Sequence, residues 1–243
     1  MRAFLARVVL PFAALALAAA PACAGEFSVT PIRADLKPGA LSETIPVTNH
    51  ASKPLRVNIR LMAWTQDEAG NDVYKESGDL VYFPRQMDVP PNGKRLVRVG
   101  AKAPAGVVER SYRLFIEEEP DTSSPGAGQV AFYFRFGVPI FLPPVAPRPT
   151  PEVDPPVLAD GTLKVQVRNA GNQHFKINKV SVSDGAGYGQ DVSGWYMLPG
   201  ARRTYVASIP GDVCRKARTL AVGIQGDGIQ IDRTLNVDPA SCR

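Results

Sequence analysis

The chain has 243 residues, 44% of them hydrophobic and 21% charged, and 28 Lys and Arg against 23 Asp and Glu give a formal net charge of +5. The basic residues are spread along the chain without a basic run, so a nucleic-acid partner is not expected. This length is comfortable for two domains that each bury a hydrophobic core.

The N-terminal segment has the pattern of a secretory signal peptide. Arg2 and Arg7 mark its positive region, residues 8–20 are almost unbroken apolar sequence, and small residues end it at Ala24. The apolar run is shorter than the roughly 20 residues of a membrane-spanning helix, and no later segment is apolar enough for stable membrane insertion. We therefore expect residues 1–24 to be cleaved on export. Lipid attachment at Cys23 is the alternative, which Pro21 disfavours.

The next part of the chain is predicted to form seven short β-strands. Segments rich in Val, Ile, Tyr and Phe recur about every ten residues, separated by Pro, Gly, Asn and Ser, and no amphipathic helical run of useful length is present. Seven strands match one immunoglobulin-like sandwich. The predicted strands are 27–36, 42–49, 55–65, 80–88, 94–99, 111–118 and 130–142.

A proline-rich stretch then predicts a domain boundary, because a stiff extended segment cannot enter the interior of a sheet. Beyond it, segments 163–169, 176–184, 204–208, 219–225 and 229–235 predict a second, smaller sandwich. Trp64 and Trp195 are expected in the sandwich cores. The expected fold class is all-β, with two immunoglobulin-like β-sandwich domains. The expected division is signal peptide 1–24, N-terminal domain 25–143, linker 144–151 and C-terminal domain 152–243.

Residues that perform catalysis or bind metals are scarce. The two histidines, His50 and His174, lie in polar stretches next to turn-forming residues, and both are expected on the surface. The sequence has no Gly-x-Ser-x-Gly elbow, no His-x-x-x-His or Cys-x-x-Cys pair and no Asp-rich calcium loop. We therefore expect no catalytic residues, no metal and no cofactor. An enzyme or metal carrier on a sandwich scaffold stays the alternative that fold-level analogy leaves open.

Two cysteines, Cys214 and Cys242, remain once the predicted signal peptide is removed. An exported protein meets an oxidising environment, which favours their pairing, so the sequence predicts a disulfide. Two unpaired thiols are the alternative.

The strand predicted at 130–142 is apolar on both faces. One face carries Val130, Phe132, Phe134, Phe136, Val138 and Ile140 in alternation, and Tyr133 and Phe141 lie on the other. Part of the first face is expected in the domain core. An edge strand that is apolar on both faces is unusual unless a partner covers it. We therefore expect an incoming chain to pair with this strand through main-chain hydrogen bonds, with pockets for the alternate side chains.

Several segments, in their order and spacing, resemble the periplasmic chaperones of the chaperone-usher pathway, which assemble pili and other fibres on Gram-negative outer membranes. These segments are SVTPIR (28–33), VTN (47–49), PPNGKRLVRV (90–99), YRLFIEEEP (112–120) and the strand 130–142. Three further segments, RFGVP (135–139), NAGNQH (169–174) and WYMLPG (195–200), resemble the archaic, or alternate, branch of the family, whose members serve thin fibres and spore-coat-like surface proteins.

The resemblance implies a boomerang of two immunoglobulin-like domains, located in the periplasm. It implies that the seventh strand completes an unfinished fibre (pilin) subunit, which is then delivered to an outer-membrane usher, with no cofactor. The donor face implied is Val130, Phe132, Phe134, Phe136 and Val138.

The resemblance also implies an anchor for the C-terminal carboxylate of the subunit, made by an arginine of the first strand and a lysine of the seventh. Arg33 falls at the arginine position, but Pro139 falls at the lysine position. A carboxylate that enters a partly buried site needs more than one charge-assisted partner, so a second cation is expected to compensate. The candidates are Arg98, Arg113 and Arg135. For each of them, an ordinary surface arginine beside a carboxylate such as Glu117 or Glu118 is the alternative.

A structural or accessory component of the fibre itself is the alternative from another class. Such subunits usually have one incomplete domain and a donor extension at the mature N-terminus. This chain enters its first predicted strand within a few residues of the cleavage site and has two complete-looking domains, which favours the chaperone.

Overall fold

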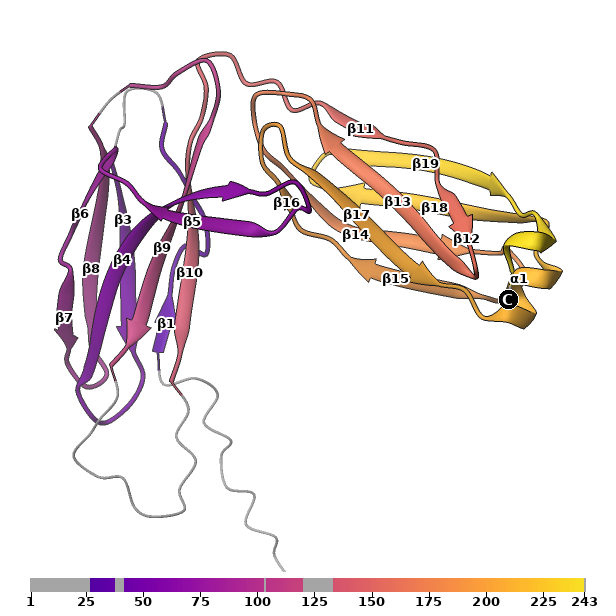
Figure 1. Ribbon diagram of the computed structural model, residues 1–243. Coiled ribbons are helices and arrows are strands. Elements are labelled where there is room, and N and C mark those ends of the chain that lie inside the picture. The colour runs from indigo at the N-terminus through magenta and orange to yellow at the C-terminus, as the bar shows by residue number, and fades with distance from the viewer. Residues whose placement is uncertain (1–26, 38–41, 103, 120–132, 243) are drawn as a thin grey trace, which may run out of the picture.

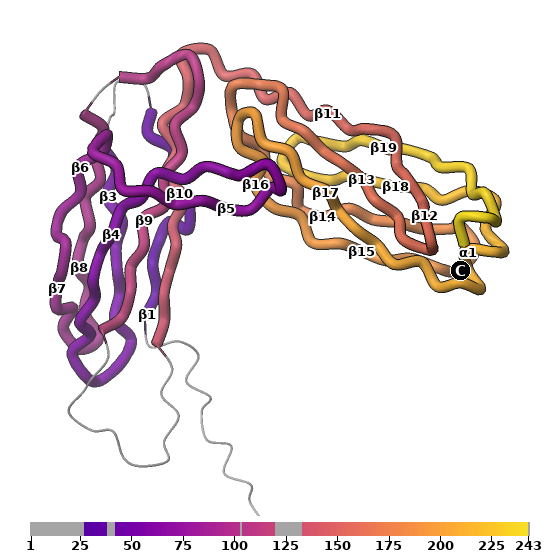
Figure 2. The backbone as a smooth tube through the Cα atoms, viewed as in Figure 1, coloured from indigo at the N-terminus to yellow at the C-terminus, as the bar shows by residue number. Residues whose placement is uncertain are grey.

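The computed structural model describes residues 27–37, 42–102, 104–119 and 133–242. These residues form two β-sandwiches that meet at an angle, like the arms of a boomerang (Figure 1). Figure 2 follows the chain through the first sandwich, over the bend and into the second. The predicted fold class, all-β with two immunoglobulin-like sandwiches, is confirmed. The predicted signal peptide lies outside the described residues, as do Val130 and Phe132.

The first sandwich has two sheets. One has the order β1 (Phe27–Val29), β3 (Ser42–Asn49), β8 (Lys94–Ala101), β6 (Leu80–Phe83). The other has the order β2 (Ala34–Asp35), β10 (Arg135–Leu142), β9 (Arg110–Glu118), β4 (Leu55–Gln66), β5 (Asp72–Glu76), with β7 (Gln86–Val89) paired to the first half of β4. Among the described strands, β2 alone runs parallel to its neighbour, β10.

Two segments predicted as single strands are divided between the sheets. The predicted strand 27–36 becomes β1 in one sheet and β2 in the other, and the predicted strand 80–88 becomes β6 and β7 in the same way. Each change of sheet occurs beside a proline, Pro31 or Pro84, whose ring nitrogen has no hydrogen to donate to a ladder. Strand β5 was not predicted.

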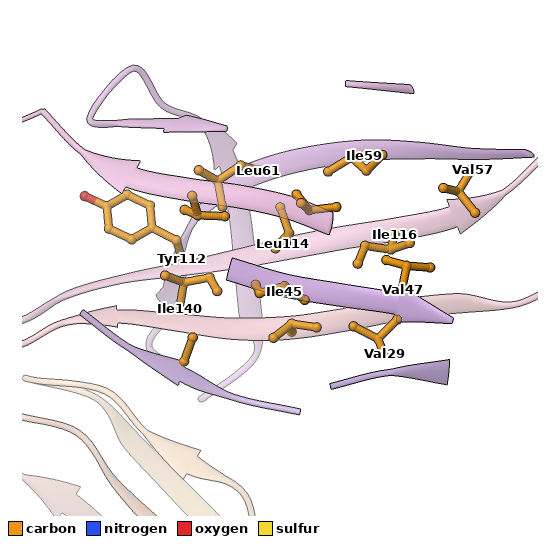
Figure 3. Close-up of a cluster of buried hydrophobic side chains, with 14 of the residues drawn as sticks. Val29, Ile45, Val47, Val57, Ile59, Leu61, Tyr112, Leu114, Ile116 and Ile140 are labelled. Atoms are coloured by element: carbon orange, nitrogen blue, oxygen red, sulfur yellow. The ribbon is translucent and has the colours of Figure 1, made fainter. Parts of the chain in front are cut away.

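The core of the first sandwich follows from the alternation of its strands. Inward residues of β3, β4 and β9 are buried at alternate positions, as the period of two requires. Toward the second sandwich, outward residues of β4 and β9 such as Trp64 and Phe115 are buried as well. Burial of each such side chain contributes about 1.5–3 kcal/mol before entropy is counted. Figure 3 shows these side chains meeting between the two sheets, among them Ile45, Val47, Val57, Ile59, Leu61, Leu114, Ile116 and Ile140.

The second sandwich also has two sheets, and the sequence predicted its long strands but missed its short ones. One sheet contains β11 (Pro151–Val153), β12 (Val157–Ala159), β13 (Thr162–Asn169) and β17 (Arg202–Ser208). The other contains β15 (Gly189–Ser193), β14 (Phe175–Ser183), β18 (Thr219–Gly226) and β19 (Ile229–Asn236), with β16 (Tyr196–Met197) beside β14. Strands β11, β12, β15 and β16 were not predicted, because two to five residues are too few for a periodic signal.

The helices are short. Helix α1 (Gly211–Lys216) carries Cys214, and the 3₁₀ turn η1 (Pro239–Ser241) precedes Cys242. These cysteines form the predicted disulfide, with their Cα atoms 5.6 Å apart. Across the described ranges, no helix combines the length and apolar character needed to cross a membrane.

Contacts on both sides of the bend hold the sandwiches together. At the proline-rich crossing, the Asn172 side chain donates to the carbonyls of Val107 (2.9 Å) and Ala146 (3.0 Å) and accepts from the Arg148 amide (2.8 Å). On the other side, β4 and β5 extend as an arm toward β16 (Figure 1), where the side chain of Gln66 forms two hydrogen bonds to the second sandwich. The relative placement of the two sandwiches is therefore fixed by side chains as well as by the connecting chain.

Candidate functional site

An aromatic cluster lies where the two sandwiches meet. Trp64 and Phe141 belong to the first sandwich, yet they pack into the hydrophobic core of the second. The Trp64 ring centroid lies 5.9 Å from that of Phe141 and 5.4 Å from that of Tyr196, and Phe141 stacks on His174 at 3.6 Å. We call these four residues the aromatic cluster. A cavity of about 430 Å³ opens beside Trp64 at the same junction.

Arg33 reaches the aromatic cluster from the connection between β1 and β2. Its guanidinium lies 5.3 Å from the centre of the Phe141 ring and forms two short hydrogen bonds to the Asp35 carboxylate, both 3.0 Å. Burial by itself would lower the pKa of Arg33, but the hydrogen bond and negative charge of Asp35 outweigh it and raise the pKa above its ordinary value. The arginine is therefore a permanent cation, with about a third of its side chain still exposed.

Arg113 reaches the same cluster from β9. In the ladder between β9 and β10 it lies directly opposite Pro139, and its guanidinium lies 4.8 Å from the Trp64 ring centre and 5.6 Å from that of Trp195. A cation placed against the face of an aromatic ring is attracted by the electrons of that ring. The Nη1 atom of Arg113 is buried and has no hydrogen-bond partner among the described residues, a costly state for a charged group that a carboxylate would relieve.

Gly137 makes room for Arg113. A Cβ atom at this position would lie 2.9 Å from Nε of Arg113 and 3.2 Å from a ring carbon of Phe115. The missing side chain thus lets the guanidinium lie across β10 toward the junction.

The Tyr196 hydroxyl interacts electrostatically with both arginines. Burial is the main cause that raises the pKa of its hydroxyl, and the positive charges of Arg33 and Arg113 both act against that rise. Both cations are therefore close enough to act on one hydroxyl group. The acidic groups nearby are Asp35 and Asp227, the latter 4.0 Å from Arg33.

The other two candidate cations lie elsewhere. Arg135 is exposed on β10, where its Nε lies 2.7 Å from Glu117 and its guanidinium covers the Phe115 ring. Arg98 is exposed on β8, in the other sheet of the sandwich. Of the three candidates, only Arg113 shares the aromatic cluster with Arg33.

His174 was predicted to lie on the surface, and this prediction is wrong. It is buried, with 6% of its surface exposed, and its Nδ1 lies 2.7 Å from the buried carboxylate of Glu109. The polar residues around His174 in the sequence suggested exposure, but the first sandwich covers it, which no local pattern reveals. His50 is exposed as predicted, with its Nε2 2.8 Å from the Ser28 hydroxyl.

The two tryptophans differ in their outcome. Trp64 is buried in a sandwich core as expected, but it is the core of the second sandwich, which it reaches from the first. Trp195 was also expected in a core, but it is only partly buried and donates its Nε1 hydrogen to Asp72. The sequence signal that could have indicated this surface is Phe141, an outward residue on a strand that is apolar on both faces, but its cover was predicted to be an incoming chain. Its cover is the second sandwich.

The edge of β10 is only partly paired. On one side β10 pairs with β9 along its whole length, and on the other β2 pairs only with Ile140 and Phe141. Residues 135–139 therefore present main-chain groups to which no described strand is paired, a template for another chain.

The structure describes only three residues of the predicted donor face: Phe134, Phe136 and Val138. Val138 is fully buried in the core, Phe136 is partly buried with its ring 4.9 Å from that of Phe27, and Phe134 is 39% exposed with its ring 6.5 Å from Phe27. Exposure thus increases toward the described start of this segment, away from the junction.

Comparison with known proteins identifies one family. Residues 26–147 match the family described as pili and flagellar-assembly chaperone, PapD N-terminal domain. No curated protein sequence matches the chain.

Solved structures share the fold over nearly the whole chain. One is a chain of the CsuC–CsuE chaperone–tip adhesion subunit pre-assembly complex from archaic chaperone-usher Csu pili of Acinetobacter baumannii, with 16% identity, a TM-score of 0.63, and 86% of this chain and 98% of that chain covered. The YadV chaperone has 13% identity and a TM-score of 0.61, and the match covers 87% of this chain and 100% of that chain. A chain of the Salmonella enterica SafA pilin–SafB chaperone complex has 17% identity and a TM-score of 0.53, covering 86% and 95%. At these identities the likeness is one of fold.

Proposed function

The chain belongs to the family of pili and flagellar-assembly chaperones with a PapD N-terminal domain, and on this premise we propose that it is a periplasmic chaperone of the archaic branch. It binds fibre subunits by lending them β10 and delivers them to an outer-membrane usher. Residues 1–24 are its export signal, and residues 25–143 and 152–243 are its two domains, joined by the linker 144–151. Two of the structural relatives are complexes of a chaperone with a tip adhesion subunit or a pilin, which supports a subunit as the partner.

The pairing of Arg33 with Arg113 carries this proposal. The two cations flank one aromatic cluster, and Arg113 stands across the ladder from Pro139, where the family pattern leads one to expect a lysine. We propose that the C-terminal carboxylate of the subunit binds here, with Arg113 in the place of that lysine. The unpartnered Nη1 of Arg113 and the planar fork of guanidinium donors suit a carboxylate.

The open edge of β10 supplies the other half of the proposed interaction. A subunit strand that pairs with residues 135–139 gains main-chain hydrogen bonds, and Phe134 and Phe136 then fill its pockets in alternation. Because the carboxylate is held at the junction, the end of the subunit strand is fixed there, which sets the register of the pairing. The free energy comes from pairing and apolar burial, without a nucleotide.

The test is coexpression of the tagged chaperone with an exported fibre subunit from the same source, followed by purification from the periplasm. We expect a one-to-one complex. Arg33→Ala and Arg113→Ala should each weaken it about tenfold or more, the value of one charge-assisted hydrogen bond, while leaving thermal stability nearly unchanged. Arg168→Ala is the matched control, because Arg168 is an exposed arginine paired with Glu152 on β11 of the second sandwich.

Two outcomes would contradict the proposal. Full capture by the Arg113→Ala variant would remove Arg113 from the anchor. A subunit that folds and accumulates equally well without this protein would overturn the chaperone function and favour a structural component of the fibre.

A further inference from the structure

Lys176, on β14 of the second sandwich, is a cation that was not among the predicted site residues. In the ladder between β14 and β16 it lies directly opposite Tyr196, and the preceding pair is Phe175 opposite Met197. Phe175 and Met197 are buried in the core of the second sandwich. Because successive side chains of a strand point to opposite faces, Lys176 and Tyr196 both belong to the outward face.

This outward face meets the first sandwich. The Tyr196 ring centroid lies 5.4 Å from that of Trp64 and 5.7 Å from that of Phe141, and both of these rings come from the first sandwich. The Nζ atom of Lys176 lies 5.7 Å from the centre of the Tyr196 ring. The ammonium group therefore lies beside the aromatic cluster, which the two arginines of the proposed carboxylate site reach from the first sandwich.

Asp227 is a neighbour of both Lys176 and Arg33. It lies in the turn between β18 and β19, its amide donates to the Lys176 carbonyl at 3.0 Å, and its carboxylate lies 4.0 Å from Nη1 of Arg33. Arg33 and Arg113 both act electrostatically on the hydroxyl of Tyr196, the residue whose ring Lys176 contacts. Three cations from two sandwiches thus surround one tyrosine.

The three cations differ in their counter-charges. Arg33 has two carboxylates beside it, since it is hydrogen-bonded to Asp35 and lies 4.0 Å from Asp227. Neither Arg113 nor Lys176 forms an ion pair with any residue in the described part of the chain. An incoming carboxylate at Arg33 would be repelled by the two carboxylates already there. Arg113 and Lys176 are the cations with charge left to offset that repulsion.

We propose that Lys176 is a third cation of the carboxylate site, and that the C-terminal carboxylate of the subunit binds it together with Arg33 and Arg113. The inference rests on the proposed function, which supplies the carboxylate. An ammonium group on a flexible four-carbon side chain can turn from the Tyr196 ring toward an anion. The family pattern has its lysine on the seventh strand, where this chain has Pro139. Lys176 supplies an ammonium group from the second sandwich instead, so the end of the subunit strand contacts both sandwiches.

The experiment compares two synthetic peptides with the C-terminal strand sequence of a fibre subunit from the same source, one ending in a free carboxylate and the other in an uncharged amide. The purified wild-type protein should bind the carboxylate peptide about tenfold or more tightly than the amide peptide. Lys176→Met removes the ammonium group but keeps an unbranched side chain. It should weaken binding of the carboxylate peptide about tenfold, the value of one charge-assisted hydrogen bond, and leave binding of the amide peptide nearly unchanged. Lys179→Met is the matched control, because Lys179 is a partly exposed lysine of the same strand whose Nζ lies 3.0 Å from Asp191.

The same measurements separate this inference from the proposed function. If wild-type protein and Lys176→Met prefer the carboxylate peptide equally, Lys176 is not part of the site, while the proposed function stands. If Lys176→Met weakens both peptides alike, Lys176 supports the structure of the junction and does not bind the carboxylate, which also overturns the inference. If wild-type protein binds the two peptides equally, or captures no subunit on coexpression, the proposed carboxylate site fails and the inference fails with it.

Discussion

Arg113 depends for its position on a residue that has no side chain. Its guanidinium occupies the space beside Gly137 and lies between two tryptophan rings at the junction. From the sequence, Arg113 was one of three equivalent candidates for the second cation, each of which could also be an ordinary surface arginine. The register of β9 against β10 distinguishes it, since only Arg113 is opposite Pro139.

Gly137→Ala tests this arrangement. The new methyl group would approach within 2.9 Å of Arg113 Nε, so the flexible arginine must move while the backbone stays. We expect the free energy of unfolding to change by no more than about 1 kcal/mol. Subunit capture should fall several-fold. Gly189→Ala is the control, because a Cβ there meets nothing within 4 Å. Equal capture by both variants would show that the exact position of Arg113 is unimportant.

His174 illustrates a residue that local sequence misassigns. Its neighbours are polar and turn-forming, but Glu109 approaches it from the first sandwich and accepts hydrogen bonds from its main chain and ring. A buried carboxylate and imidazole satisfy each other in this way, which removes much of the cost of burying them. Because the two residues are far apart in sequence, only the packing of one sandwich on the other brings them together.

At the scale of elements, β10 contributes residues to two hydrophobic cores. Its inward residues Val138 and Ile140 belong to the core of the first sandwich, and its outward residue Phe141 belongs to the core of the second. The sequence predicted that part of one face lies in the domain core and that a partner covers the remaining apolar surface. The structure assigns the cover of Phe141 to the second sandwich and leaves the edge at residues 135–139 unpaired by any described strand.

Phe134→Glu tests the proposed donation of β10. Phe134 is 39% exposed, so a charge there should cost little folding stability, whereas in the complex it would place a carboxylate in an apolar pocket. We expect the periplasmic complex with the subunit to be lost. The control is Val206→Glu, which changes a valine of similar exposure (49%) on β17. Normal recovery of the complex by Phe134→Glu would mean that the donor face is assigned wrongly.

At the scale of the whole molecule, the arm formed by β4 and β5 fixes the bend between the sandwiches. Gln66 donates to the Tyr196 carbonyl at 2.9 Å and accepts from the Leu198 amide at 3.0 Å, and Asp72 accepts from the Trp195 indole at 3.0 Å. These hydrogen bonds keep the aromatic cluster in place beside Arg33 and Arg113. The proposed carboxylate site therefore exists only while the two sandwiches keep this angle.

Gln66→Ala tests the arm. The change leaves the buried amide of Leu198 without its partner, which should cost about 1–3 kcal/mol and loosen the bend. We expect a lower unfolding temperature by calorimetry and a broader distribution of interdomain distances by small-angle scattering. Gln230→Ala is the control, because the hydrogen bond that its side chain donates goes to Asp232 on the same strand and not to the first sandwich. An unchanged scattering profile for Gln66→Ala would show that the angle is set without the arm.

The sequence by itself determined the fold class, most of the long strands and the disulfide. Hydrophobic alternation with a period of two is a local signal, and Cys214 and Cys242 are the two cysteines that follow the predicted signal peptide. Arg33 and the donor face came from resemblance to a family. Only the tertiary structure decided that 27–36 and 80–88 are each shared between two sheets, that His174 is buried against Glu109, and that Arg113 joins Arg33. The physical reason is that alternation tells which side chains face inward, whereas the neighbours of a strand and the cover of its outward face depend on contacts between segments distant in the chain.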